Sequence, residues 1–390
     1  MHLLLLSAAL LGHAFLWIAM VNRAHAAAMP RWAIWLFTAL AGVLMVVPPV
    51  AFAWWALQAE VASFSQFHWQ LLPKSTVLYL CICWTSALLT LGWWLRRHVL
   101  HRPPAVSRRH RTRSVEMADA AATRYNQLAH HFLVHLPLNE ILQLDMSERA
   151  IEIPRLRAPL DGLSIVHLSD FHFTGRVPKA YFQEVIRHAN ETDPDLMAVT
   201  GDLVDFDAYI DWIPDTLGRL RARHGVYFVL GNHDTRVDVK RLRRTLVDSG
   251  LVDLGGRWTR IEIRGEPIIL AGNELPWLSP AADMDRCPPR DADGGPLRIV
   301  LSHSPDQLSW AQAYDVDLLL AGHTHGGQIR LPLIGPILSP SREGVKYASG
   351  VFHAPPTVMH VTRGISGELP IRLNCPPEMA HLVLHSAPSA

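Results

Sequence analysis

Five short apolar runs after residue 160 each end in residues that commonly bind metal ions. The runs lie at 163–170, 195–202, 225–234, 297–305 and 316–325. Their nearly continuous Val, Ile and Leu content is typical of strands that are covered on both faces. Between them lie stretches of helical composition, such as 178–191 and 236–250. Strands that alternate with helices predict a layered α/β domain, in which the polar strand ends converge.

The polar residues at these run ends are Asp, Asn and His. They are Asp170, His172, Asp202, Asn232, His303, His323 and His325. One pair of histidines could arise by chance, but five run ends of this kind indicate a metal site. All seven side chains offer oxygen or nitrogen, a donor set that suits Mn, Fe, Zn, Ni or Co, and Mn is the ion that we expect. The four cysteines form neither a disulfide framework nor a CxxC zinc pattern.

The motifs D-x-H, GD, GNHD, H and GHTH follow one another in this order. Together they resemble the calcineurin-like metallophosphoesterase superfamily over residues 160–375. The longer stretches GHTHGGQIRLP and VTRGISGELPIRLNCPPE resemble a membrane-associated bacterial subgroup. That subgroup includes phosphodiesterases and an enzyme that cleaves UDP-2,3-diacylglucosamine in lipid A synthesis. The resemblance implies an α/β fold in which two mixed β-sheets form a sandwich flanked by helices.

The resemblance also implies two divalent metal ions that share one carboxylate. Asp170, His172 and His325 would hold one ion, Asn232, His303 and His323 would hold the other, and Asp202 would bridge both. We expect alternation along an extended chain to direct His323 and His325 toward different ions. Two such cations lower the pKa of a bound water and offset the negative charge of phosphate oxygens.

His233 has no place in this ligand set, and the resemblance implies that it stabilises the transition state or the leaving group. Asp205 matches the carboxylate that orients this histidine in relatives, although a solvated turn residue is the alternative reading. Phe206 stands where Ser/Thr phosphatases of the superfamily carry an arginine, which argues against a protein phosphatase. Arg363 could contact phosphate or form a structural salt bridge, and we expect Asp234 to be a turn or cap residue.

Three further apolar runs precede this domain, at 2–21, 32–56 and 76–95. Each has the roughly 20 residues that a membrane span needs, and none contains Asp, Glu, Lys or Arg. Because transport pathways and proton relays need ionisable groups within the spans, we expect an all-α transmembrane anchor over residues 1–96 rather than a transporter. Buried core helices are the alternative, and the sequence Ala24-His25-Ala26 leaves open a cleaved signal.

Basic residues predict the orientation of this anchor. Residues 96–113 contain seven arginines and no acid, and the first loop contains Arg23 and Arg31. The second loop carries only Glu60 and Lys74. Since positive loops stay on the cytoplasmic side, we predict a multi-pass protein of the cell (inner) membrane with a cytoplasmic catalytic domain.

The region between the anchor and the catalytic domain is also basic. We expect a linker over residues 97–140, in which 117–139 could lie on the membrane surface as an interfacial helix. The metallophosphoesterase domain itself is expected to span residues 141–390.

These features predict a membrane-anchored, binuclear metal-dependent phosphohydrolase. It would cleave a phosphodiester or pyrophosphate bond of a lipid-linked or nucleotide-linked substrate. Two alternatives stay open, a UDP-2,3-diacylglucosamine pyrophosphatase and a non-enzymatic membrane sensor or scaffold that binds metal. The expected partners are a phosphate-containing small-molecule or lipid substrate and membrane lipids, and no nucleic acid is expected.

Overall fold

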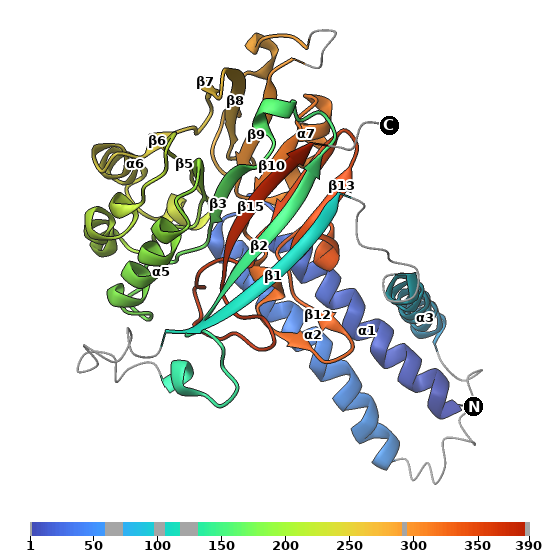
Figure 1. Ribbon diagram of the computed structural model, residues 1–390. Coiled ribbons are helices and arrows are strands. Elements are labelled where there is room, and N and C mark those ends of the chain that lie inside the picture. The colour runs from blue at the N-terminus through green and yellow to red at the C-terminus, as the bar shows by residue number, and fades with distance from the viewer. Residues whose placement is uncertain (1, 59–72, 97–105, 118–131, 291–294, 387–390) are drawn as a thin grey trace. The chain divides into compact units, whose positions relative to one another are not determined.

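The computed structural model describes residues 2–58, 73–96, 106–117, 132–290 and 295–386 (Figure 1). The chain divides into two compact units, Met1–Arg102 and Pro103–Ala390. Within the described residues, the first unit is helical and the second contains the β-strands.

The first unit consists of three long apolar helices. They are α1 (His2–His25), α2 (Arg31–Gln58) and α3 (Lys74–Leu95). Their apolar segments have mean hydropathies of 2.1, 2.1 and 1.6, and they are long enough to cross a membrane, which suggests membrane association. His13 on α1 is buried, and its ring nitrogens contact the Tyr79 hydroxyl on α3 at 2.6 Å and the Met45 carbonyl oxygen on α2 at 3.1 Å. The contacts of this polar side chain link the three helices.

Two mixed β-sheets form the second unit. The first has the strand order β1 (Ser107–Glu116), β2 (Gln143–Ile153), β15 (Glu378–Ser386), β3 (Leu163–Leu168), β4 (Leu196–Thr200), β5 (Val226–Val229) and β6 (Val252–Asp253). The second has the order β13 (Gly350–Ala354), β14 (Thr357–Val361), β10 (Leu318–Ala321), β9 (Leu297–Ser302), β8 (Glu266–Asn273) and β7 (Trp258–Ile263). The other elements are a short hairpin of β11 (Arg330–Leu331) and β12 (Gly335–Pro336), and the helices α5 (Lys179–Glu191), α6 (Val239–Asp248) and α7 (Leu308–Ala313).

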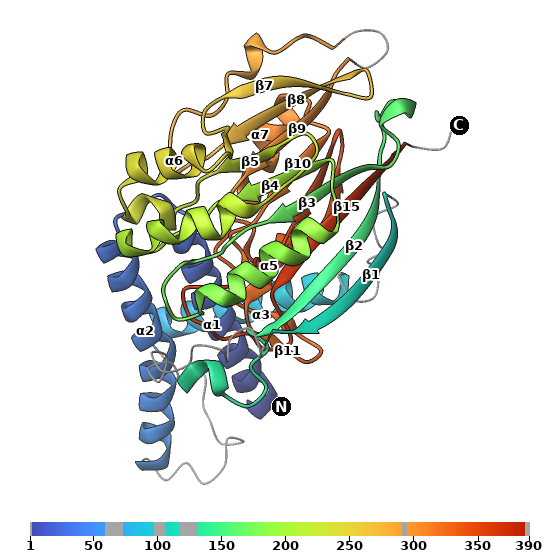
Figure 2. The same ribbon diagram turned by 60° about the vertical axis from the view of Figure 1, so that its left-hand side comes forward.

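The central strands of both sheets are buried on both faces, as their continuous apolar sequences predict. In β9, Ile299 packs in the core between the sheets, whereas Val300 packs on the opposite face with residues of α7. In β3, Ile165 faces the same central core, and Val166 packs in the cluster that includes residues of α5. Helix α5 lies over the first sheet (Figure 2). Two mixed sheets flanked by helices confirm the predicted fold class.

The arginine-rich segment that we expected to be a linker contributes a strand to the first sheet. Residues Ser107–Glu116 form β1, which pairs antiparallel with β2 and places Arg111 opposite Glu148. Opposite charges across a strand pair are stabilising, and charged side chains on an edge strand discourage further pairing. The linker prediction is therefore wrong for this segment. Most of the predicted interfacial helix lies outside the described residues, and its described end contains a 3₁₀ turn at Phe132–His135.

Candidate metal centre

The seven predicted ligands come together where five strands end. Asp170 and His172 follow β3, Asp202 follows β4 and Asn232 follows β5, all in the first sheet, whereas His303 follows β9 and His323 and His325 follow β10 in the second. The site therefore lies where the carboxyl ends of strands from both sheets meet.

The chain turns sharply at these positions. Asp170, Asp202, His323 and His325 have positive φ angles of 55°, 54°, 70° and 50°. A 3₁₀ turn begins at His325, so the expectation of an extended chain between His323 and His325 is wrong. The bent backbone, rather than strand alternation, directs their side chains. Gly322 permits this approach, because a Cβ atom there would lie 2.0 Å from the Ser169 hydroxyl.

One group of ligand atoms consists of Asp170, His172 and His325. The Nε2 atoms of His172 and His325 lie 3.3 Å apart. Asp170 Oδ1 lies 3.9 Å from the first of these nitrogens and 3.5 Å from the second. The three atoms surround a common point, as the ligands of a single cation do.

The second group lies next to it and consists of Asp202, His303 and His323, with Asn232 beside them. His303 Nε2 lies 3.2 Å from Asp202 Oδ2, 3.2 Å from Asn232 Oδ1 and 3.1 Å from His323 Nδ1. Asp202 Oδ2 is also 3.6 Å from His172 Nε2 in the first group. This carboxylate oxygen thus lies between the two groups.

Most side chains of this cluster are buried, so the pKa values of its carboxylates and histidines depend on burial and on the charges beside them. Burial raises the pKa of Asp170. Burial acts in the same direction on Asp202, but the charges of His303 and His233 hold the pKa of Asp202 well below its usual range. Burial would lower the pKa values of His172 and His303, yet neighbouring carboxylates, chiefly Asp205 for His172 and Asp202 for His303, raise both to about 9.

The buried carboxylates therefore require positive charge beside them. The ligand atoms in each of the two groups lie within 4.8 Å of one another. Oxygen and imidazole nitrogen are donors that divalent transition metals prefer. The residues present fit metal ions at this site.

His233 and Asp205 lie at the edge of the cluster and contact each other. Asp205 Oδ1 lies 2.5 Å from His233 Nδ1, and Asp205 Oδ2 lies 2.9 Å from His172 Nδ1. Asp205 is 4% exposed, so the alternative of a solvated turn residue does not hold. The charges of His172 and His233 overcome the effect of burial and depress the pKa of Asp205.

Arg236 and Glu368 also lie at this edge, and the motifs did not indicate either. An Arg236 N–H donates to His233 Nε2 at 2.8 Å, and Arg236 Nη1 lies 3.2 Å from both Asp205 Oδ1 and Glu368 Oε2. Arg236 ends the 3₁₀ turn that starts at His233, a spacing that could have pointed to it. Glu368 comes from a distant loop and carries no such signal.

Two other residues support the ligands without having been predicted. The buried Arg372 guanidinium donates to the carbonyl oxygens of His325 at 2.9 Å, of Arg363 at 2.8 Å and of Ser366. The Trp277 ring lies against His323, with their ring centroids 4.8 Å apart. Arg372 thus holds the backbone beside the candidate ligand His325, and Trp277 packs against the ring of the candidate ligand His323.

Three residues near the motifs have structural roles. Arg363 donates to Asp145 and Glu378, so of the two roles considered for it the structure shows the structural salt bridge. Asp234 accepts hydrogen bonds from the backbone N–H groups of Leu203, Val204 and Gly231, as expected of a cap residue. His167 is buried between Thr200 and His360.

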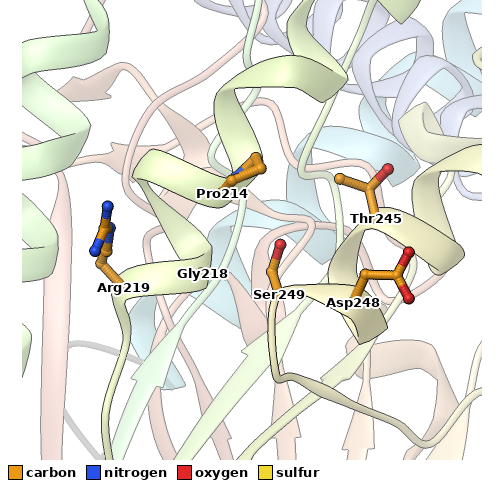
Figure 3. A pocket seen from close by; sticks show the side chains of 6 residues that line it. All are labelled: Pro214, Gly218, Arg219, Thr245, Asp248 and Ser249. Atoms are coloured by element: carbon orange, nitrogen blue, oxygen red, sulfur yellow. The ribbon is translucent and has the colours of Figure 1, made fainter.

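A pocket of about 350 Å³ lies elsewhere on the second unit (Figure 3). It is lined by Pro214, Gly218, Arg219, Thr245, Asp248 and Ser249. None of these residues belongs to the candidate ligand cluster. The cluster of candidate ligands, and not this pocket, therefore marks the candidate active site.

Comparison with known proteins gives one consistent picture. The sequence profile of the family "Calcineurin-like phosphoesterase" matches residues 163–327. Phosphodiesterase YaeI of Escherichia coli (strain K12) is 32% identical over 226 residues, which cover 56% of this chain and 81% of that protein. The uncharacterized metallophosphoesterase YkuE of Bacillus subtilis (strain 168) is 32% identical over 251 residues, 62% of this chain and 86% of that protein. A transmembrane protein with metallophosphoesterase domain from Danio rerio is 29% identical over 255 residues, 61% of this chain and 57% of that protein.

Proposed function

Because the chain belongs to the calcineurin-like phosphoesterase family, we propose that it is a membrane-anchored hydrolase that uses two metal ions to cleave a phosphodiester or pyrophosphate bond. Family membership makes it a metal-dependent phosphoesterase. The proposal adds the number of ions, the roles of individual residues, the orientation in the membrane and the substrate class.

The position of Asp202 Oδ2 between the two ligand groups carries the proposal. We assign Asp170, His172 and His325 to one ion, Asn232, His303 and His323 to the other, and Asp202 to both. Mn is the ion that we expect, and Fe, Zn, Ni and Co suit the same donors. When bound, two such ions offset the charge of phosphate oxygens and lower the pKa of a water molecule.

His233 is assigned to the leaving group. Asp205 holds Nδ1 of the imidazole and so leaves Nε2 as the nitrogen that can exchange a proton with the substrate. In the structure Arg236 donates to this nitrogen, so His233 can protonate a leaving oxygen only after Arg236 has moved from it. The phosphate group of a substrate, being anionic, offers Arg236 an alternative partner.

The anchor supports a substrate in or near the membrane. We propose that α1, α2 and α3 cross the cell membrane and that the positive residues beside them keep the catalytic domain in the cytoplasm. Confinement to the bilayer favours a lipid-linked phosphodiester or pyrophosphate. UDP-2,3-diacylglucosamine is one substrate of this class, and a nucleotide-linked substrate is another. A purely non-enzymatic sensor or scaffold that only binds metal would have no need for His233, which lies outside both ligand groups.

The test uses the purified full chain in detergent with Mn²⁺. The substrates are bis(p-nitrophenyl) phosphate, p-nitrophenyl phosphate, a phospholipid and UDP-2,3-diacylglucosamine, and Asp202→Asn is the inactive control. We expect hydrolysis of a diester or pyrophosphate that requires metal and is lost in the control. Exclusive hydrolysis of the monoester, or equal activity in the control, would contradict the proposal.

A further inference from the structure

Exposed aliphatic side chains gather on the loop that follows the candidate metal centre. Leu331, Leu333, Ile334 and Leu338 lie in or beside the β11–β12 hairpin and are 37%, 87%, 43% and 54% exposed. Arg330 Nε donates to the carbonyl oxygen of Gly326 at 2.8 Å. This bond fastens the hairpin to the turn that begins with the ligand His325.

Two neighbouring segments extend this surface. The Gln328 side-chain amide donates to the carbonyl oxygen of Leu369, which is itself 54% exposed. Asn139 donates to the next carbonyl oxygen, that of Pro370, at 2.8 Å and brings with it Leu138, which is 80% exposed. We call these six residues, Leu331, Leu333, Ile334, Leu338, Leu369 and Leu138, the Leu333 surface. A gathering of exposed aliphatic side chains of this kind marks a site of interaction with a protein or a membrane.

We propose that the Leu333 surface docks on the lipid bilayer that holds the apolar helices of the same chain. The three helices are long and apolar enough to cross a membrane, and the chain tethers the second unit to them, so a bilayer that holds them is an apolar partner within reach. Arg342 and Lys346 follow the hairpin and are exposed, and the neighbouring acid Glu343 pairs with Lys346. Exposed aliphatic side chains that are followed in the chain by cations fit the acyl boundary and the anionic headgroups of a membrane surface.

Docking at this surface also has a consequence for catalysis, which rests on the proposed function. The hairpin and His325 share one loop, so contact of the hairpin with lipid brings headgroup phosphates close to the ligand cluster. The substrate class that this favours is a phosphodiester or pyrophosphate whose acyl chains stay in the bilayer.

The experiment measures the depth of a probe at Leu333 in the full chain. Cys81 is exposed and the other three cysteines are buried, so Cys81→Ser gives the background for labelling. Leu333→Cys carries an NBD fluorophore, and the protein is reconstituted in vesicles of phosphatidylcholine and phosphatidylglycerol with or without nitroxide-labelled lipid. The matched control is Val247→Cys, since Val247 lies on α6 and is 49% exposed.

We expect nitroxide lipid to quench the NBD emission at position 333, because the probe lies at the headgroup and acyl boundary, and to leave the emission at position 247 unchanged. Equal emission with and without nitroxide at position 333, or equal quenching at both positions, would overturn the proposal. A blue shift without quenching would also overturn it, because a protein such as a second copy of the chain would then cover the surface. Hydrolysis of bis(p-nitrophenyl) phosphate by the same samples tests the proposed function separately.

Discussion

Asp205 connects His172 and His233 through one carboxylate, with Oδ2 at 2.9 Å from Nδ1 of His172 and Oδ1 at 2.5 Å from Nδ1 of His233. One ring points its other nitrogen at the ligand cluster, and the other ring lies at the edge of that cluster. A carboxylate in this position sets the tautomer and the orientation of both imidazoles. Metal binding and proton transfer are therefore expected to depend on the same side chain.

Asp205→Asn should impair both functions. The amide keeps the shape of the carboxylate but loses the charge that supports two imidazoles, so we expect metal affinity to fall about 10–100-fold along with turnover. Hydrolysis measured over a Mn²⁺ titration gives both quantities. Asp211→Asn, at an exposed acid paired with Arg241, is the control and should behave like the wild type. If the Mn²⁺ dependence were unchanged, the role of Asp205 would be limited to orienting His233, and the predicted role in metal binding would be wrong.

His233→Ala should remove turnover and keep the metal, because His233 lies outside both ligand groups. Loss of a group that transfers a proton should lower the rate by a factor on the order of 10²–10⁴. Metal analysis of the purified variant accompanies the rate measurement. A variant without metal would show that His233 has a ligand or structural role.

Asp202→Asn should damage the site more than Asp170→Asn or His325→Ala. Its carboxylate oxygen lies within 3.6 Å of His172 Nε2 and 3.2 Å of His303 Nε2, so both ions would lose a charged ligand and repel each other with less compensation. We expect metal content near zero and no turnover even at excess Mn²⁺. The three variants are compared side by side for metal stoichiometry and rate. Two retained metals in Asp202→Asn, with loss in either of the others, would refute the bridging assignment.

Acid should destabilise the fold through His167. Burial lowers the pKa of His167 from 6.5 to about 3, so the unfolded chain binds a proton there in a pH range where the folded chain does not. Stability contributed by the neutral ring is thus complete above pH 6.5 and declines as the pH falls from 6.5 toward 3. Urea unfolding of the metal-free full chain across this range should show a shallower decline for His167→Gln. An identical decline in both proteins would contradict the assignment.

The catalytic domain should face the cytoplasm. A reporter that is active only outside the cytoplasm, fused after Ala390, should be silent, because the basic segments beside the spans stay inside. The same reporter fused after Gln66, which lies in the sequence between the second and third apolar runs, should be active. Activity from the first fusion would mean that the first apolar run is cleaved or that the number of spans differs from three.

The supporting residues of the site could not be predicted from the sequence. Arg236 and Glu368 meet at His233 from segments that are 132 residues apart in the chain, and Arg372, in the same loop as Glu368, reaches the carbonyl oxygen of His325. No local pattern encodes such contacts, since they depend on how loops pack. The pairing of the arginine-rich β1 with β2 could not be predicted either, because a polar edge strand lacks the alternation of apolar and polar residues by which strands are recognised in a sequence.

The sequence by itself determined the three apolar helices, a layered α/β domain and the seven ligand candidates, and the resemblance of its ordered motifs to a known family implied the two-sheet sandwich. The helices and the ligand candidates are local properties, namely the length of an uncharged run and the type of residue that directly follows a buried strand. Only the tertiary structure decided that Asp202 Oδ2 lies between His172 and His303, and that His323 and His325 are aimed by positive φ angles rather than by an extended chain. The packing of the two sheets sets these distances and backbone angles. Contacts between residues far apart in the chain stabilise them.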